Sequence, residues 1–255
     1  MEFAGFVITN SNVRPCSTYL EAVMDFPTPT DITGIRSWFG LINQVAYAFT
    51  QTKSMAPFRE LLKPGNKFYW DEHLDHLFTE SKKAIVEKVR EGVKIFDMSK
   101  MTCLITDWSK MGTGFCLLQK HCNCSGVNPM CCVSGWQLTF AGSKFNNKAE
   151  SNYAPVEGEC LAVVKALEKA KYFVLGCKKL IVATDHKPLL KILDDRELEN
   201  ISNPRLLKFK EKTLRYRFSI IHIPGHANAG ADAASRYPGG SMSSISPEDL
   251  SLIHI

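Results

Sequence analysis

Apolar residues in the first third of the chain recur at helical spacing. In the clearest case Ile35, Trp38 and Ile42 lie three or four residues apart, after Thr30 or Asp31 as the capping residue. Proline-containing stretches before and after this helix separate it from its neighbours. Three helices are therefore predicted, over residues 17–24, 31–49 and 71–89, with Ser17 capping the first and a Lys63-Pro64-Gly65 turn before the third. A single apolar strand is predicted before them, over residues 2–8.

The period changes near Val93. Short runs of Val, Ile, Leu and Thr, separated by turns that contain Gly, replace the helical spacing and are typical of strands. Strands are predicted over residues 93–96, 102–107, 112–118, 135–142, 179–184 and 217–223, and helices over 157–172, 188–193, 205–214 and 228–235. This order predicts an α/β domain over residues 93–238. The Pro-Gly-Gly-Ser sequence that follows predicts a disordered tail over residues 239–255.

Composition is that of an ordinary globular protein. The 255 residues are 45% hydrophobic and 22% charged, and no apolar run is long enough to span a bilayer. The first residues lack the basic run and apolar core of a signal peptide. We therefore expect an intracellular, cytoplasmic protein without a membrane partner. The net charge of +5 is compatible with a polyanionic partner, but it is equally typical of a solvated basic surface.

Nine cysteines occur in the chain, and many of them lie in apolar surroundings where a reduced thiol packs as a small hydrophobic group. These are Cys103, Cys116, Cys160 and Cys177. A second set, His121-Cys122-Asn123-Cys124 and Cys131-Cys132, falls in one long segment between two predicted strands. Four cysteines and a histidine suggest zinc. The spacing is not the paired Cys-x-x-Cys of structural zinc sites, however, so the sequence favours a metal-free loop.

Four acidic residues occupy positions that could support catalysis. Asp107 and Asp185 end predicted strands, Glu159 lies on the helix between them in sequence, and Asp232 lies on the last helix. Each one alone could cap a helix or pair with a lysine. All four in this order favour a converging set, whose mutual repulsion divalent cations relieve. Ligand sets made only of oxygen suit Mg²⁺ or Mn²⁺, and two such ions about 4 Å apart form the usual clamp for in-line phosphodiester cleavage.

Five blocks of sequence around these acids carry a family resemblance. They are residues 106–114 (Thr-Asp-Trp-Ser-Lys-Met-Gly-Thr-Gly), 153–164, 184–189 (Thr-Asp-His-Lys-Pro-Leu), 223–226 (Ile-Pro-Gly-His) and 231–236 (Ala-Asp-Ala-Ala-Ser-Arg). In this order they resemble the RNase H domain of gypsy-type LTR retrotransposons. The resemblance implies an RNase H-like mixed five-stranded sheet flanked by helices and an RNA–DNA hybrid as substrate. It also implies Asp107, Glu159, Asp185 and Asp232 as ligands of two Mg²⁺ ions, with Mn²⁺ as the alternative.

The first 92 residues resemble the reverse transcriptase that precedes RNase H in the same family. The similar stretches are residues 3–8, 13–15, 26–41, 57–58 and 68–70. The resemblance implies the end of the palm, with its primer-grip strand, over residues 1–12, a mainly helical thumb over 13–65 and a connection helix over 66–92. It implies the rest of the Pol polyprotein as partner, namely palm, fingers and integrase, in cytoplasmic virus-like particles. The Tyr-x-Asp-Asp turn of the polymerase site does not occur in the sequence, so we expect no primer extension from this chain.

Several single residues matter to this hypothesis. Glu157 competes with Glu159 as metal ligand, and two helical residues at this spacing cannot face one metal ion. The Leu-Ala-Val-Val that follows favours Glu159 by resemblance. His226 matches a histidine that assists proton transfer or product release, with an inert surface histidine as the alternative. His186 matches the family's Asp-His pair and could merely shape its loop.

Trp108 stands where the family usually has a small residue. A tryptophan that points toward the cleft would crowd the hybrid. Trp108 is expected instead to pack on the face of its strand opposite Asp107, because neighbouring side chains of a strand point to opposite faces. Phosphate contacts are predicted from the basic helix near the carboxyl end, and recognition by shape and 2′-hydroxyls is expected. The candidates are Arg205, Lys208, Lys210, Lys212 and Arg215, followed by Arg217.

Two other classes of protein are compatible with parts of this pattern. One is a non-catalytic RNase H-like tether of a polymerase or of a domesticated element, against which the intact acid set argues. The other is a different superfamily member. Integrases place the glutamate after the second aspartate, and proofreading exonucleases place an acid two residues after the first, and neither arrangement occurs here.

Overall fold

The computed structural model describes residues 1–45, 55–62, 65–126, 131–132, 135–236 and 238. The predicted end of the second helix, two residues of the Lys63-Pro64-Gly65 turn and the predicted tail over 239–255 lie outside these residues. Among the described helices, none is long and apolar enough to cross a membrane.

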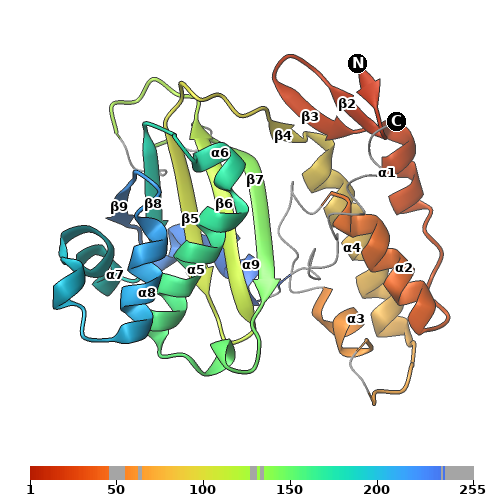
Figure 1. Ribbon diagram of the computed structural model, residues 1–255. Helices are drawn as coiled ribbons and strands as arrows, with labels where there is room; N and C mark the ends of the chain where they lie inside the picture. Colours follow the sequence, from red (N-terminus) through yellow and green to blue (C-terminus); the bar gives the residue numbers. More distant parts are fainter. Residues whose placement is uncertain (46–54, 63–64, 127–130, 133–134, 237, 239–255) are drawn as a thin grey trace.

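A mixed five-stranded sheet forms the centre of the carboxy-terminal part (Figure 1). Its spatial order is β7-β6-β5-β8-β9. The strands are β5 (Thr102–Trp108), β6 (Gly112–Lys120), β7 (Trp136–Phe145), β8 (Leu180–Thr184) and β9 (Ser219–His222). β5 is antiparallel to β6 and parallel to β8. Because parallel strands end on the same side of a sheet, Asp107 near the end of β5 and Asp185 just after β8 reach the same edge.

Helices cover both faces of this sheet, with α5 in front of it and α9 behind it in Figure 1. α5 (Pro155–Lys169), α6 (Lys171–Val174) and α8 (Pro204–Thr213) bury one face, which includes Leu104 and Leu117. α9 (Ala229–Arg236) covers the other face, where Ile105 is buried with Ala231. Alternation along β5 therefore directs Trp108 to the α5 side and Asp107 to the α9 side. The remaining helical segments are Glu150–Asn152, α7 (Pro188–Leu190), Lys191–Asp195, Leu198–Asn200 and Gly225–Asn228.

The amino-terminal part packs helices around an aromatic core. Trp38, Phe58 and Phe78 are almost fully buried there, and the rings of Trp38 and Phe78 meet edge to face at 4.9 Å. Its helices are α1 (Ser17–Met24), α2 (Ile32–Asn43), α3 (Ala56–Glu60) and α4 (Glu72–Arg90). Asp31 caps α2 as predicted and accepts a hydrogen bond of 2.6 Å from the Gly34 backbone. α1 differs from the prediction, since Cys16 rather than Ser17 is its N-cap.

A four-stranded sheet completes this part, in the order β1-β2-β3-β4. Its strands are β1 (Glu2–Phe3), β2 (Phe6–Ile8), β3 (Asn12–Pro15) and β4 (Val93–Lys94). The single strand predicted over residues 2–8 was wrong, because Ala4 and Gly5 adopt φ values of 48° and 81° and fold the segment into a hairpin. The strand predicted to open the α/β domain at Val93 was also misplaced: it pairs with β3 and not with the five-stranded sheet.

Candidate active site

Three carboxylates converge where β5 and β8 end. Asp107 is on β5, Glu159 is on α5, and Asp185 is the first residue after β8. One oxygen from each of the three lies within 4.8 Å of the others. Asp107 and Glu159 are 5% and 8% exposed, so two of the three carboxyl groups are withdrawn from water. Such a group requires either protonation or a cation.

The electrostatics of the cluster show the same requirement. Burial, reinforced by Asp232 and Asp185 and opposed by a hydrogen bond from Ser235, raises the pKa of Asp107 to about 6. Burial and the charges of Asp107 and Asp185 raise the pKa of Glu159 to about 9. Glu159 Oε2 is buried and has no hydrogen-bond partner among the described residues. An acceptor oxygen left in this state is what a bound cation would satisfy, so the residues fit a divalent metal ion.

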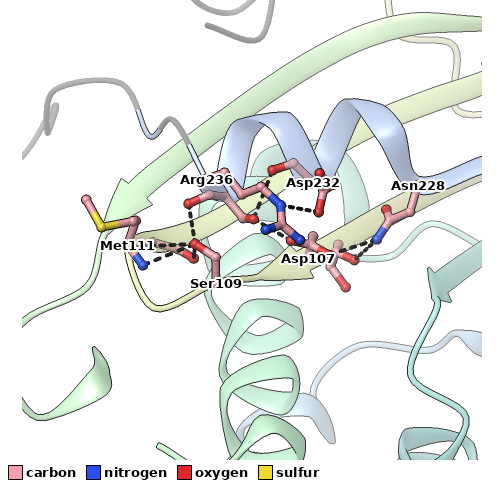
Figure 2. A network of polar contacts seen from close by, with 9 residues as sticks. Asp107, Ser109, Met111, Asn228, Asp232 and Arg236 are labelled. Atoms are coloured by element: carbon pink, nitrogen blue, oxygen red, sulfur yellow. Dashed lines mark hydrogen bonds and ion pairs between the residues drawn. The ribbon is translucent and has the colours of Figure 1, made fainter. Parts of the chain in front are cut away.

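Asp107 is held in place from α9 and from the turn directly before it (Figure 2). Its Oδ1 accepts a hydrogen bond of 3.0 Å from Asn228 Nδ2, and its Oδ2 accepts one from the Ser235 hydroxyl. Ser109 in turn donates to the Ser235 carbonyl at 2.7 Å. Sequence reasoning missed the roles of Asn228 and Ser235. Ser235 follows Asp232 by three residues on α9, and Asn228 ends the turn directly before this helix, so their closeness in sequence to Asp232 was a usable signal.

Asp232 lies beside the three-acid cluster rather than inside it. Its Oδ1 accepts a hydrogen bond of 2.7 Å from Arg236 Nε, one turn further along α9, and its side chain is 38% exposed. It is nevertheless near enough for its charge to raise the pKa values of Asp107 and Glu159. α9 can approach the sheet closely because Gly114 of β6 has no side chain. A Cβ at this position would be 2.4 Å from the Ala231 carbonyl oxygen.

Glu157 has a different environment from Glu159. Its Oε1 accepts from Asn203 Nδ2 at 2.9 Å, and its Oε2 forms an ion pair of 2.7 Å with Arg205. The Ala154 backbone also donates to it. Burial opposes ionisation, but the hydrogen bonds from Asn203, Ala154 and Arg205 outweigh it and lower the pKa of Glu157. Glu157 therefore joins α5 to α8 and does not join the carboxylate cluster.

The two candidate histidines lie in segments that border the cluster. His226 is exposed on the turn Gly225–Asn228, and a Cβ at Gly225 would be 3.6 Å from Asp185 Oδ2, so this turn borders the cluster. His186 follows Asp185, and its backbone donates to Thr184 Oγ1 at 3.1 Å. Burial lowers the pKa of His186, against the charge of Asp185.

The predicted phosphate contacts on and near α8 separate into two groups. Lys210 is 6% exposed and its ammonium donates to the Arg196 carbonyl, so its prediction as a phosphate contact was wrong. The predicted residues that remain at the surface are Arg205, Lys208, Lys212, Arg215 and Arg217. Three of them line an open groove of about 740 Å³ beside α5: Arg205, Lys208 and Lys212. Arg205 also lies 4.2 Å from the centre of the Tyr153 ring.

Trp108 packs against α5, as its position on the strand predicts. A Cβ at Gly158 would be 2.2 Å from Trp108 Cδ2, so the indole occupies the space of the missing side chain. The bulky residue after Asp107 is thus accommodated on the face away from α9 and does not crowd the carboxylates.

Comparison with known proteins identifies the carboxy-terminal part. The family described as the RNase H-like domain found in reverse transcriptase matches residues 97–216. Residues 97–216 are an RNase H-like domain of reverse transcriptase. This domain contains Asp107, Glu159 and Asp185, while Asp232 and its helix follow the matched segment.

Relatives of the RNase H-like domain extend the match to the amino-terminal part. The Retrovirus-related Pol polyprotein from transposon gypsy of Drosophila melanogaster is 26% identical over 265 residues, covering 100% of this chain. The Transposon Tf2-3 polyprotein of Schizosaccharomyces pombe is 26% identical over 239 residues, covering 92% of the chain. The chain spans 24% and 17% of the lengths of these polyproteins. The predicted relationship to gypsy-type Pol polyproteins is confirmed.

A solved structure supports the fold. The foamy viral protease-reverse transcriptase in complex with RNA/DNA hybrid has a TM-score of 0.62 and 18% sequence identity to this chain, and the match covers 88% of this chain and 29% of that one. The mixed five-stranded RNase H-like fold, preceded by a mainly helical segment, is therefore as predicted.

Proposed function

We propose that this chain is the RNase H part of a retrotransposon reverse transcriptase and hydrolyses the RNA strand of RNA–DNA hybrids by a two-metal mechanism. The observation that carries the proposal is the convergence of Asp107, Glu159 and Asp185, with an unsatisfied buried oxygen on Glu159. We also propose that residues 1–12 are the end of the reverse transcriptase palm, that residues 13–65 form the thumb and that residues 66–92 form the connection. The rest of the Pol polyprotein, in cytoplasmic virus-like particles, would be the partner of this chain.

The ligands of the proposed site are the three clustered acids and Asp232. The chemistry that two bound Mg²⁺ ions supply is activation of the attacking water and stabilisation of the leaving oxygen, and Mn²⁺ can substitute. Asn228 and Ser235 orient both oxygens of Asp107 before any ligand arrives. Arg236 forms an ion pair of 2.7 Å with Asp232, and it would have to release this carboxylate for Asp232 to bind a metal ion.

His226 is the proposed proton carrier of the site. It is exposed beside Asp185, a position from which an imidazole can give a proton to a leaving oxygen or assist product release. Hybrid recognition is assigned to the groove with Arg205, Lys208 and Lys212 of α8, which Leu161 of α5, the helix that carries Glu159, also lines. Contacts of this kind read the backbone and 2′-hydroxyls and weaken as salt concentration rises.

The decisive experiment compares two isosteric substitutions on one helix. The full chain is incubated with an RNA–DNA hybrid carrying a labelled RNA strand, with Mg²⁺ or with EDTA. Glu159→Gln is expected to reduce cleavage more than about a hundredfold, because loss of a residue that only hydrogen-bonds to a metal ligand already costs about 10- to 100-fold in metal affinity or activity. Glu157→Gln removes the same charge two residues away, outside the cluster, and is expected to retain cleavage of the hybrid.

Two results would contradict the proposal. One is equal cleavage by Glu159→Gln and wild type, and the other is cleavage that persists in EDTA. A wild-type chain that binds the hybrid but leaves its RNA strand intact with both Mg²⁺ and Mn²⁺ would favour the alternative function, a non-catalytic tether.

A further inference from the structure

Four cysteines meet in the connection between β6 and β7, at the end of the sheet away from the carboxylates. The other five cysteines of the chain are buried. These four are not core residues: Cys124 is exposed and the rest are partly exposed. Their sulfur atoms all lie within 4.8 Å of one another, although the residues are up to ten positions apart in sequence. Packing of small hydrophobic thiols does not account for a cluster at the surface.

The cluster has the dimensions of a mononuclear thiolate site. A tetrahedral Zn²⁺ ion with Zn–S bonds of about 2.3 Å requires sulfur atoms about 3.8 Å apart. The Sγ atoms of Cys122 and Cys131 are 3.5 Å apart, and the other pairs fall within the same 4.8 Å limit. A disulfide would need a separation of about 2.05 Å. Iron–sulfur clusters also take four thiolates but distribute them over at least two metal ions, which calls for a wider arrangement of sulfurs.

The surrounding residues are arranged to support such a site. The Trp136 indole donates to Cys131 Sγ at 3.1 Å, and His121 N donates to the Gly135 carbonyl at 2.7 Å and closes the base of the loop. Gly135 is required by close approach, because a Cβ there would be 2.2 Å from Cys132 Sγ and 2.6 Å from Cys122 Sγ. A hydrogen bond donated to a ligand sulfur, such as that from Trp136, orients the ligand and partly offsets the negative charge that four thiolates carry.

A cation also lies on the loop. The Lys120 ammonium donates to the Gly126 carbonyl at 2.6 Å and to the Cys124 carbonyl, which ties the first half of the loop to the end of β6. A Zn²⁺ ion with four thiolates has a net charge of about −2, and this ammonium lies on the loop that would carry that charge.

We propose that Cys122, Cys124, Cys131 and Cys132 bind one structural Zn²⁺ ion. The pattern Cys-x-Cys followed by Cys-Cys lacks the paired Cys-x-x-Cys spacing, which is why sequence alone favoured a metal-free loop. The hairpin supplies the missing proximity, since β6 and β7 bring both ends of the long connection together. With four protein ligands the ion has no open position for a substrate.

The site is separate from the proposed nuclease centre. Asp107 is paired with Gly114, whereas the loop begins after Lys120, and six residues of strand span about 20 Å at 3.3 Å per residue. The expected role of the metal is to fix the loop, and metal content and hybrid cleavage can be measured independently.

The test is the metal content of the full chain purified under reducing conditions. We expect about one zinc per chain. Cys124→Ala is expected to weaken zinc affinity more than about a hundredfold, because loss of a residue that only hydrogen-bonds to a metal ligand already costs about 10- to 100-fold. Cys177→Ala, at a buried thiol outside the cluster, and Asp107→Asn, in the carboxylate site, serve as matched controls that keep the zinc. Replacing zinc by Co²⁺ should give sulfur-to-cobalt charge-transfer and tetrahedral d–d absorption in wild type and both controls.

A substitution at Trp136, which donates a hydrogen bond to Cys131, provides a second test. Trp136→Phe keeps an aromatic ring but removes the N–H that reaches Cys131, so zinc affinity should fall about tenfold while the zinc stoichiometry at saturation stays the same. The proposal is overturned by a wild-type chain that takes up neither zinc nor cobalt, by zinc content unchanged in Cys124→Ala, by iron in place of zinc, or by disulfides joining these cysteines in reduced preparations.

Discussion

On α5, two glutamates separated by one residue have opposite electrostatic environments. Glu157 is the third residue of the helix and is stabilised as a carboxylate by Asn203, Arg205 and a backbone N–H. Glu159 is buried beside Asp107 and Asp185 and is favoured in its neutral form until a cation arrives. The sequence alone could only rank the two by resemblance, because the residues that bind Glu157 lie 46 and 48 positions away.

The raised pKa of Glu159 should be visible in the pH dependence of the free energy of unfolding. Its pKa is raised from 4.5 to about 9, so in the metal-free chain the folded state holds a proton that the unfolded state has released. The resulting stabilisation is fully present below pH 4.5 and is lost as pH rises to about 9, because stability falls wherever the folded state binds more protons. Asp107, whose pKa is raised from 3.8 to about 6, adds a further loss of stability as pH rises between these two values.

We therefore predict that the unfolding free energy of the EDTA-treated chain falls as pH rises through this window, measured by urea denaturation at several pH values. Glu159→Gln should remove most of the fall above pH 6. Glu157→Gln should leave that part of the curve unchanged, since the pKa of Glu157 is lowered and its contribution lies on the acid side. Saturating Mg²⁺ should flatten the wild-type curve. A Glu159→Gln curve as steep as that of the wild type would contradict the assignment.

At the scale of elements, the end of the sheet that carries the carboxylate cluster depends on two glycines that allow close packing. Gly114 lets α9 approach β6, and Gly158 lets Trp108 of β5 pack into α5. The second contact positions the turn of α5 from which Glu159 projects. A side chain at Gly158 would meet the body of the indole ring rather than a flexible tip, so the ring or the helix must move.

The effect of Gly158→Ala on the free energy of unfolding is predicted to change sign when Trp108 is removed. In a helix, alanine is more favourable than glycine by about 1 kcal/mol. Overpacking a core costs about 1–3 kcal/mol, and the 2.2 Å approach to Trp108 places this site at the upper end. In the wild-type background the substitution should thus destabilise the chain by about 2 kcal/mol, measured by urea unfolding. In a Trp108→Ala background the same change should stabilise it by up to about 1 kcal/mol. Destabilisation of equal size in both backgrounds would mean that the indole is not the obstacle.

Element prediction from sequence succeeded where a long periodic pattern specified one answer. The strands of the five-stranded sheet and helices such as α4 were predicted, because the apolar residues that they bury recur regularly along many positions of the sequence. It failed at short elements. β1 and β2 are two and three residues long and are separated by left-handed Ala4, a conformation that nothing in an apolar run indicates. The two-residue strand at Val93 could not reveal its partner, because pairing depends on distant residues.

At the scale of the molecule, the amino-terminal part and the RNase H-like domain meet along β7. β4 lies against β7, and Leu138 of β7 packs on the amino-terminal core. At the other end of β7, the Arg59 guanidinium is 5.3 Å from the centre of the Phe39 ring and 5.7 Å from that of Phe145. Both terminal nitrogens of Arg59 are buried without a hydrogen-bond partner among the described residues, and burial lowers the pKa of Arg59 to about 10.

The energetic coupling of the two parts should be measurable at this arginine. A cation over an aromatic ring contributes about 0.5–1 kcal/mol at exposed sites and about 2 when desolvated, and Phe145 is 40% exposed, so we predict a coupling near 1 kcal/mol. The measurement is a double-mutant cycle of Arg59→Leu and Phe145→Leu by urea unfolding. Phe140→Leu is the matched control, since Phe140 is also on β7 but packs on the α5 side of the sheet.

The cycle with Phe140 should be additive within about 0.3–0.5 kcal/mol, as expected for residues that share no contact. Additivity in the cycle with Phe145 would mean that Arg59 does not join the two parts. The interpretation requires one cooperative transition, which is checked by comparing far-ultraviolet circular dichroism with tryptophan fluorescence. Fluorescence reports both parts, because Trp38 and Trp70 lie in the amino-terminal part and Trp108 and Trp136 lie in the RNase H-like domain. The two probes should therefore give coincident transitions in every variant of the cycle.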